Sequence, residues 1–348
     1  MKPRVFQQAV LNWYEHQGRT NLPWQNPITP YRVWISEIML QQTQVSTVIP
    51  YFERFMESFP NIELLAKASV DDVLHHWTGL GYYARARNLH KTAQLIAFDM
   101  DQQFPDTVEE LSALPGIGRS TAGAIRSIGF KKPAAILDGN VKRVLARYGA
   151  IKGWPGKTVV HNQLWDIAEK YSPNQKTQEY TQAMMDLGAL VCTKNSPDCV
   201  LCPIASGCKA LSEDSQTLYP GKKPKKVMPV KESIFLMLRN SEGHILLQKN
   251  PPAGLWGGLW VLPQIKLHTE LGTICKTLGL SVRSKSVLDK QRHTFSHFHL
   301  DYQPLRVEVE ESSNNINENS HLVWYNIKKP LSLGMPAPIK ALLNLNIM

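Results

Sequence analysis

The sequence Leu114-Pro-Gly-Ile-Gly118 lies between two helical patterns, one that begins at Thr107 and one that runs from Arg119. Gly116 and Gly118 permit a tight turn that leaves backbone N–H groups exposed at a helix N-terminus. Such a turn can hold a nucleic-acid phosphate without reading the base sequence. The pattern is typical of a helix–hairpin–helix, and an ordinary helix–helix turn is the alternative.

Positive charge is concentrated just after this turn. Residues 115–160 carry nine lysines and arginines against one carboxylate, Asp138, in a chain of formal net charge +10. A run of this kind can neutralise several phosphates, and we expect Lys142 within it to contact one. The alternative is a solvated basic surface.

The length of the chain indicates two domains, since its 348 residues exceed the usual ~150 residues of one domain. No apolar run approaches the ~18 residues of a membrane-spanning helix. The N-terminus has no apolar signal region, so we expect a cytoplasmic protein.

The first domain is expected to be mainly helical and to cover residues 1–211. Apolar stripes with helical spacing run through residues 33–39 and 45–56. Capping boxes at Ser69-Val-Asp-Asp72 and Thr107-Val-Glu-Glu110 each open an apolar helix. Further helical patterns cover residues 84–97, 119–128, 140–148, 159–170 and 180–191.

The second domain is expected to be α+β and to cover residues 232–348, after a linker over residues 212–231 that has three prolines and little apolar periodicity. Ile234–Leu238 and His244–Gln248 have the pattern of a β-hairpin. Further strands are predicted near 293–300, 304–309 and 321–326, and a helix near 337–345.

Four of the five cysteines fall in one short loop, residues 192–208, with the spacing C-x6-C-x2-C-x5-C; they are Cys192, Cys199, Cys202 and Cys208. In a cytoplasmic protein such a group indicates a metal site in place of disulfides. Four-cysteine zinc sites usually consist of two close pairs, and only Cys199 and Cys202 form one here. A single compact loop favours a [4Fe–4S] cluster, and zinc stays open as the alternative. Cys275 is expected to be a buried apolar residue.

Asp138 lies in Ile136-Leu-Asp-Gly-Asn140, just before a predicted helix. Backbone N–H groups and the positive end of the helix dipole favour its charged form there. A plain helix N-cap is the alternative reading of this residue.

Glu37 lies among apolar neighbours in Val33-Trp-Ile-Ser-Glu-Ile-Met-Leu40. Burial would raise the pKa of its carboxyl group, whereas an exposed polar helix face is the alternative. One protonated acid and one ionised acid are what the cleavage of a glycosidic bond requires. The sequence does not show that Glu37 and Asp138 meet in space.

These segments together resemble the helix–hairpin–helix DNA glycosylases, and most closely the bacterial adenine DNA glycosylases of the MutY family. The resemblance covers nearly the whole chain. It is carried by Leu22-Pro-Trp24, Ser36-Glu-Ile-Met-Leu-Gln-Gln-Thr-Gln-Val45, Trp77-Thr-Gly-Leu-Gly-Tyr-Tyr-Ala-Arg-Ala-Arg87, Leu114-Pro-Gly-Ile-Gly-Arg-Ser-Thr-Ala122, Leu137-Asp-Gly-Asn-Val-Lys-Arg143, the cysteine loop, and Thr294-Phe-Ser-His-Phe-His299.

The resemblance implies an enzyme that excises adenine mispaired with 8-oxoguanine, or with guanine, from double-stranded DNA. It implies that Glu37 protonates adenine, that Asp138 faces the sugar cation, and that Asn140 helps to position Asp138. It also implies that the gap around the opposite base is filled by Gln42, Thr43, Leu80 and Tyr82. Adenine must be extruded because stacking hides its glycosidic bond. A monomer, located at the nucleoid through DNA binding and served by unidentified repair partners, is expected.

Ser120 separates this family from its relatives. Endonuclease-III-like enzymes have a lysine after Pro-Gly-x-Gly-Arg, and that amine forms a Schiff base with the sugar and cuts the strand. Because a serine cannot form a Schiff base, we expect a monofunctional glycosylase that leaves an abasic site. A glycosylase with lyase activity is the second hypothesis.

The C-terminal part resembles the Nudix fold of MutT, around Leu255-Trp-Gly-Gly-Leu-Trp-Val-Leu-Pro263. Only Glu270 offers a carboxylate between Pro263 and position 289, so the magnesium ligands of a Nudix hydrolase are missing. The resemblance implies a domain that recognises 8-oxoguanine through Ser296 and His297. A non-catalytic damage sensor or redox regulator is the third hypothesis, and it leaves Glu37 and Asp138 without a purpose.

Overall fold

The computed structural model describes residues 1–224, 227–267, 269–311 and 321–345. The chain forms two compact units. The helical unit contains Met1–Lys67 and Asn88–Lys225, and the sheet unit contains Ala68–Arg87 and Lys226–Met348. The sheet unit thus includes a segment from the N-terminal part of the sequence. The division at residues 211 and 232 that the sequence suggests stays a prediction.

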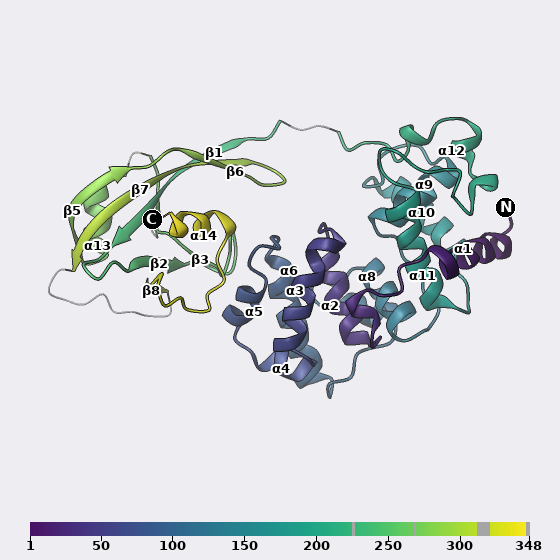
Figure 1. Ribbon diagram of the computed structural model, residues 1–348, viewed down its shortest axis with the longest axis horizontal. Coiled ribbons are helices and arrows are strands. Elements are labelled where there is room, and N and C mark those ends of the chain that lie inside the picture. The colour runs from purple at the N-terminus through teal and green to yellow at the C-terminus, as the bar shows by residue number, and fades with distance from the viewer. Residues whose placement is uncertain (225–226, 268, 312–320, 346–348) are drawn as a thin grey trace. The chain divides into compact units, whose positions relative to one another are not determined.

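Helices make up nearly all regular structure before residue 213, as predicted (Figure 1). They are α1 (Pro3–Gln17), α2 (Pro30–Leu40), α3 (Val45–Ser58), α4 (Ile62–Lys67), α5 (Val70–His76), α6 (Ala84–Gln94), α7 (Val108–Ala113), α8 (Arg119–Ala124), α9 (Gly139–Gly149), α10 (Thr158–Tyr171), α11 (Thr177–Asp186) and α12 (Lys209–Ser212). Short π-helical turns continue α6, α8 and α11 at Leu95–Asp99, Ile125–Gly129 and Leu187–Val191.

Side-chain caps fix where several of these helices begin. The hydroxyl of Ser69 accepts a hydrogen bond from the backbone N–H of Asp72 (3.1 Å), which starts α5. Thr107 caps α7 in the same way through Glu110 (3.2 Å). Both capping motifs that the sequence predicts are therefore confirmed, and each satisfies an N–H group that has no partner inside its helix.

The C-terminal residues form one mixed sheet, in agreement with the predicted α+β class. Its strands are β1 (Val230–Arg239), β2 (Ile245–Lys249), β3 (Trp260–Val261), β4 (Gln264–Ile265), β5 (Leu280–Val287), β6 (Gln291–Thr294), β7 (His299–Glu311) and β8 (Leu322–Tyr325). The main order is β3-β2-β1-β7-β5, with β4 beside β1, β6 beside β7 and β8 beside β2. Strands β1 and β7 run parallel with Leu236 opposite Leu305, and the other pairs are antiparallel.

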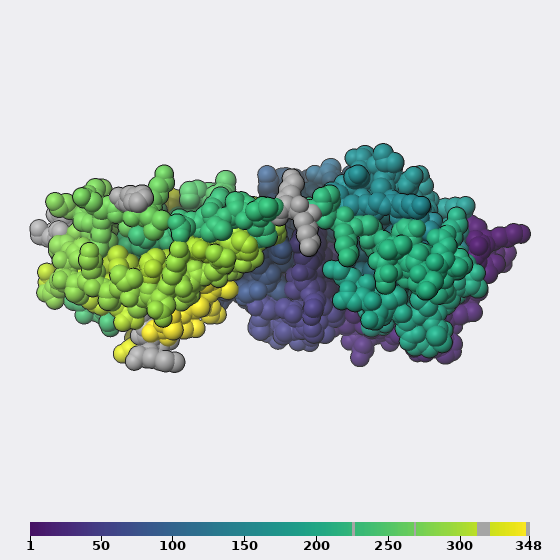
Figure 2. All heavy atoms as spheres, turned by 90° about the horizontal axis from the view of Figure 1, so that it is seen from above, coloured from purple at the N-terminus to yellow at the C-terminus, as the bar shows by residue number. Residues whose placement is uncertain are grey.

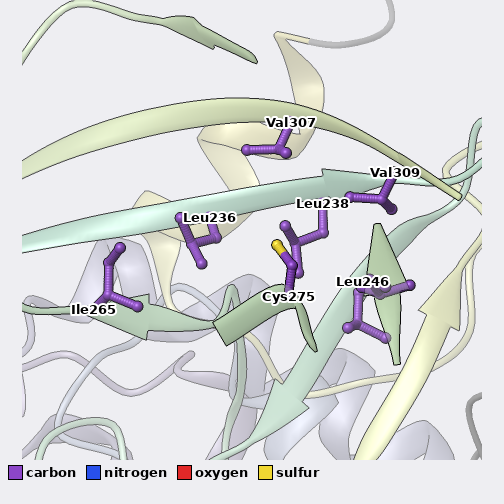
Figure 3. Packing of buried hydrophobic residues seen from close by; sticks show 8 residues of the cluster. Leu236, Leu238, Leu246, Ile265, Cys275, Val307 and Val309 are labelled. Atoms are coloured by element: carbon purple, nitrogen blue, oxygen red, sulfur yellow. The ribbon is translucent and has the colours of Figure 1, made fainter. Parts of the chain in front are cut away.

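The core of the sheet unit is formed by eight buried apolar side chains from strands and one helix (Figure 3). They are Leu236, Leu238, Leu246, Ile265, Cys275, Leu280, Val307 and Val309. Cys275 lies on α13 (Leu271–Thr277) and is buried, as predicted for a small apolar residue. Helix α14 (Ala337–Asn344) adds Ile339, Leu342 and Leu343 to the buried residues of this unit. Figure 2 draws the unit's C-terminal residues in green to yellow with all atoms.

The structure corrects the sequence prediction in two places. Residues 293–300 are not one strand, because β6 ends at Thr294 and β7 begins at His299. A tight turn joins them, closed by a hydrogen bond from the N–H of Phe295 to the carbonyl of Phe298 (2.9 Å). Strand β5 and helix α13 were not predicted, and β5 is exposed over all but its first residue, so it has no apolar alternation to recognise.

Candidate active site and cysteine loop

The predicted hairpin lies between α7 and α8 and has the expected form. The N–H of Ile117 donates to the carbonyl of Leu114 (3.2 Å), and Gly116 has a φ of +80°. A Cβ at position 116 would also lie 2.8 Å from the Cβ of Asn88, so both the backbone angle and the space favour glycine. Gly118 is exposed at the N-terminus of α8, which leaves the backbone there open to a phosphate.

The basic stretch after the hairpin divides into three groups. Lys131, Lys152 and Lys157 are exposed and Lys142 is half-buried. Arg126 and Lys132 pair with Asp106, and Arg119 pairs with Glu169 while its guanidinium lies 3.9 Å above the ring of Trp165. Arg143 and Arg147 instead point to the cysteine loop. The charge available for phosphates is therefore smaller than the sequence count suggests.

Asp138 is the N-cap of α9. Its Oδ1 accepts a hydrogen bond from the N–H of Val141 (2.7 Å), and Lys142 and Arg143 also favour its charged form. Burial outweighs these effects and raises the pKa of Asp138 above its ordinary value. The helix terminus does favour the charged form, as expected, but burial has the larger effect on the pKa.

Glu37 lies on α2 beside the buried side chains of Ser36 and Ile38. Burial raises the pKa of its carboxyl group to about 8, and the negative charge of Asp138 adds to this shift. The two carboxyl groups that the sequence could not bring together thus act on each other electrostatically. At neutral pH this environment keeps Glu37 protonated.

Ser120 lies on α8 next to the Asp138 turn. Its hydroxyl oxygen accepts a hydrogen bond from the backbone N–H of Leu137 (3.0 Å). The side chain thus fixes the residue that precedes Asp138 and contributes no amine to the site. Such a contact could not be read from the sequence.

Asn140 links this site to the cysteine loop. The guanidinium of Arg143 donates to Asn140 Oδ1 (3.0 Å), to the carbonyl of Gly188 (2.5 Å) and to the carbonyl of Cys192 (2.7 Å). A Cβ at position 188 would lie 2.6 Å from the Cβ of Asn140, so the two backbone segments meet at a distance that only glycine allows. A continuous set of contacts therefore joins the turn of Asp138 to the first cysteine.

The four cysteines line one cavity together with apolar side chains and three polar ones; its lining includes Cys192, Cys199, Cys202, Cys208, Val144, Val191, Ile204, Leu211, Arg147, Asp198 and Gln216. Arg147 Nη1 lies 3.3 Å from Cys192 Sγ, and Gln216 Nε2 lies 4.0 Å from Cys199 Sγ. N–H donors directed at sulfur and an apolar surround are features of sites that hold iron–sulfur clusters. Four thiols around a common space therefore fit such a group.

Two of the four thiols, those of Cys202 and Cys208, resist ionisation in the absence of a bound cation. Burial and the neighbouring sulfurs raise the pKa of Cys202 to about 12, and burial also raises the pKa of Cys208. Among the described residues, no group of three or more His, Cys, Asp or Glu side chains is arranged to hold a single metal ion. The cavity thus offers sulfur ligands around a space and does not bring them to one point.

Gln42 and Thr43 lie in the turn between α2 and α3 of the helical unit. Gln42 is exposed and has a φ of +59°, and the N–H of Thr43 donates to the carbonyl of Leu40 (3.2 Å). The turn thus presents a polar amide on a backbone conformation that non-glycine residues adopt rarely.

Leu80 and Tyr82 lie in the sheet unit, in the loop between α5 and α6. Tyr82 is 48% exposed with a φ of +48°, whereas Leu80 is only 6% exposed. Arg85 holds this loop, since its Nη2 donates to the carbonyls of Leu80 and Gly81 (3.2 Å each) and its guanidinium lies 5.7 Å from the Tyr82 ring. The ring of Tyr82 is therefore presented outward on a fixed loop.

Ser296 and His297 lie in the turn between β6 and β7, and both are exposed. Their side chains lie 3.3 Å apart, Ser296 Oγ to His297 Nδ1. The rings of Phe295 and Phe298 stack beneath them with centroids 4.5 Å apart. The turn thus presents two polar side chains on an aromatic base.

Helix α13 carries no carboxylate within Leu271–Thr277, as expected for a Nudix fold without hydrolase ligands.

Two family models match the chain. The HhH-GPD superfamily of base excision DNA repair proteins matches residues 35–170, and the NUDIX domain matches residues 234–345. An adenine DNA glycosylase of Buchnera aphidicola subsp. Acyrthosiphon pisum is 41% identical over 343 residues, which cover 99% of this chain and 98% of that protein. An adenine DNA glycosylase of Homo sapiens is 34% identical, over 88% of this chain and 67% of the human one.

Solved structures agree with the helical fold. A thermostable thymine-DNA glycosylase superposes with a TM-score of 0.55 at 26% identity, covering 61% of this chain and 97% of its own. A non-covalent endonuclease III–DNA complex gives a TM-score of 0.51 at 20% identity, covering 62% of this chain and 98% of its own.

Within the described residues, no helix has the length and apolar character needed to cross a bilayer.

Proposed function

Because this chain belongs to the adenine DNA glycosylases, hydrolases of N-glycosyl bonds in base excision repair, we propose that it excises adenine opposite 8-oxoguanine and opposite guanine. It acts as a monofunctional enzyme and leaves an abasic site. The observation that carries this proposal is the pair of Glu37 and Asp138, in which the first carboxyl group stays protonated at neutral pH beside the second.

Glu37 serves as the general acid. Its neutral carboxyl group donates a proton to N7 of the extruded adenine, which makes the base a better leaving group. After the bond breaks, the Glu37 carboxylate takes a proton from the attacking water. The raised pKa of about 8 suits both steps, because the group holds its proton at neutral pH and regains it between turnovers.

Asp138 faces the sugar that develops positive charge. Its carboxylate is held at the start of α9 by the N–H of Val141, and Ser120 holds the preceding residue. Asn140, fixed by Arg143, keeps this turn in place. Stabilising an oxocarbenium-like sugar needs a negative charge at one fixed position, and this set of contacts supplies it.

The absence of lyase activity rests on Ser120. The hydroxyl at this position is engaged with Leu137 N–H, and a hydroxyl cannot form a Schiff base with an abasic sugar. Lys142 supplies positive charge for a phosphate. Strand cleavage is therefore expected only after alkali treatment.

The cysteine loop holds a [4Fe–4S] cluster with a structural role. Cys192, Cys199, Cys202 and Cys208 are its ligands, and the cluster fixes the loop and the exposed Lys194 and Lys209 for contact with DNA. When bound, the cluster supplies four iron–thiolate bonds that close the loop. The reaction itself stays with Glu37 and Asp138.

Recognition of the opposite base is assigned to the two exposed turns of the sheet unit and to the α2–α3 turn. Ser296 and His297 contact the 8-oxo edge of the modified guanine. Tyr82 enters the stack beside that base, and Gln42 and Thr43 help to fill the gap around it. Leu80, buried in the same loop as Tyr82, also helps to fill this gap.

One experiment tests the proposal as a whole. Duplexes that hold A:8-oxoG, A:G or T:G are incubated with the protein and analysed with and without alkali. Release of adenine from the first two, with strand breaks only after alkali, is the expected result. Glu37→Gln should retain duplex binding and lose adenine release, and a Glu37→Gln protein that still turns over would remove this residue as the acid.

A further inference from the structure

Residues 68–87 leave the helical unit and pack in the sheet unit. One contact is an ion pair, in which Lys249 Nζ on β2 lies 2.7 Å from Asp71 Oδ2 on α5. Their side chains are only 22% and 24% exposed, and the Lys249 ammonium also lies 5.7 Å from the ring of Trp260. A pair this shielded is less screened than a surface salt bridge.

Two hydrogen bonds hold the other end of the same segment. The hydroxyl of Tyr83, a buried residue, donates to the carbonyl of Met335 (3.0 Å). Arg87 Nη1 donates to the carbonyl of Gly257 (2.6 Å). Both acceptors are backbone carbonyls, so the partners of Tyr83 and Arg87 are fixed by the course of the chain and not by a rotatable side chain.

The backbone of the sheet unit is shaped around Leu74, which is fully buried. A Cβ at Gly334 would lie 2.5 Å from Leu74 Cβ, so glycine there permits α5 to approach the rest of the sheet unit closely. A Cβ at Gly258 would make an ordinary contact with Leu74 Cδ1 at 3.7 Å, and the φ of +74° is what favours glycine at this position. Residues 68–87 are thus an integral part of this unit.

The same contacts lead to the turn that holds Ser296 and His297. Trp256 adjoins Gly257 and is buried with a φ of +51°, a conformation that is strained for a bulky residue. Its ring lies 5.6 Å from that of Phe295 and 6.0 Å from that of Phe235. Packed groups therefore connect this turn, through Trp256 and Gly257, to Arg87 and the segment of Tyr82.

We propose that residues 68–87 are the element through which the C-terminal sheet positions the Tyr82 loop, so that contact with the modified guanine and insertion of Tyr82 occur as one event. Asp71, Arg87 and Trp256 are positioning residues in this scheme. The proposal rests on the function proposed above and adds a physical link between recognition of one base and extrusion of the other. A separate recognition domain would need no such link.

The test uses charge reversal in the full-length protein. Asp71→Lys, Lys249→Asp and the double variant are compared for two quantities: single-turnover release of adenine from A:8-oxoG and A:G, and the fluorescence of 2-aminopurine placed opposite 8-oxoguanine as a measure of extrusion. Each single variant should lose roughly tenfold in preference for 8-oxoguanine and lose extrusion in parallel, about 1.4 kcal/mol of coupling. The double variant should regain both.

A matched control is the exposed ion pair Glu63 and Lys67 on α4, at 2.6 Å, where the same reversals should change neither quantity. Arg87→Lys keeps the charge but removes the planar guanidinium that reaches Gly257. If the charge-reversal variants do not fold, this variant tests the same connection. Loss of preference with normal extrusion, or no recovery in the double variant, would overturn the proposal. If the wild-type protein itself releases no adenine, the proposed function fails instead.

Discussion

At the scale of single residues, Glu37 and Asp138 form a pair of carboxyl groups whose pKa values are both raised by burial. Both Glu37 and Asp138 could be selected as candidates from their neighbours along the chain. The raised pKa of Glu37 comes first from burial, which its apolar neighbours in the sequence suggest, and then from the charge of Asp138, whose proximity the sequence does not show. The raised pKa of Asp138 depends on the burial that tertiary packing imposes, and no local pattern announces it.

The pH dependence of adenine release follows from these two shifts. Release requires Asp138 ionised and Glu37 protonated, so the single-turnover rate should rise as pH passes the raised pKa of Asp138 and fall as pH passes about 8. Because the two carboxyl groups interact, the two apparent pKa values of the pH–rate profile describe the pair and not either residue alone. Rates measured from pH 4 to 10 check this, and a rate that stays flat above pH 9 would contradict the role of Glu37.

Activity requires Glu37, but the same residue should lower the stability of the fold at high pH. A carboxyl group with a raised folded-state pKa stabilises the fold below its unfolded pKa, and this contribution is lost as pH rises to about 8, by about 1.4 kcal/mol per pKa unit. Glu37→Gln should therefore be more stable than the wild type at pH 9 and closer to it at pH 5. Urea unfolding at both pH values measures the difference, and Glu63→Gln on exposed α4 is the control.

At the scale of elements, apolar periodicity predicted the helices well where one face is buried, as in α3 with Val48, Phe52 and Phe55. It did less well where tertiary contacts replace a local pattern. The alternating residues 293–300 contain a turn, and β5 takes its place only through pairing with β7. The cysteine spacing predicted the cluster loop. It did not predict that Arg147 holds this loop, because Arg147 is one of the nine basic residues that the sequence assigns to phosphate binding.

Arg147 joins α9 to the cysteine loop and to the segment that follows it. It is 2% exposed, and its guanidinium donates to the carbonyls of Thr193 (2.6 Å) and Tyr219 (3.1 Å) besides Cys192 Sγ. No carboxylate pairs with it among the ion pairs of the described residues, so thiolate charge in the loop would be its counter-ion. An unpaired buried cation is costly.

Arg147→Gln should therefore weaken retention of the proposed cluster. It removes the charge and most donors, whereas Arg147→Lys keeps only the charge. In the presence of a chelator, the visible absorbance of the purified Arg147→Gln variant should decay several-fold faster than that of the wild type. The decay rate of Arg147→Lys should lie between the two. Arg126→Gln, which lies away from the loop and pairs with Asp106, serves as the control. Equal decay of all proteins would show that Arg147 does not support the loop.

At the scale of the whole molecule, the sequence predicted two parts of the right classes, because composition and periodicity change after residue 231. It did not predict that residues 68–87 join the second part. Their pattern is that of ordinary amphipathic helices, and the partner of each buried face lies more than 150 positions away in the chain. Such a pairing has no local signature.

Removal of residues 226–348 should have two effects. The preference for 8-oxoguanine over guanine opposite adenine should weaken, and the melting temperature of the remaining protein should fall because Leu74 and Tyr83 lose the surfaces that cover them. Full-length protein with Ser296→Ala and His297→Ala should show the first effect without the second, since both side chains are exposed. Unchanged preference in the truncated protein would refute the assigned role of the C-terminal part.

The union of residues 68–87 with the C-terminal sheet also bears on how the chain is made. Arg87 leaves the ribosome 170 residues before Gly257. At a synthesis rate of roughly 5–20 residues per second, that interval lasts on the order of 10–30 s. During it, Leu74 and Tyr83 lack the sheet-unit surface that later covers them, while the helices on either side can already pack. We therefore expect chaperones that bind exposed apolar segments to bind the nascent protein during this interval. Residues 68–87 are covered only when the C-terminal sheet has been made and packs against them.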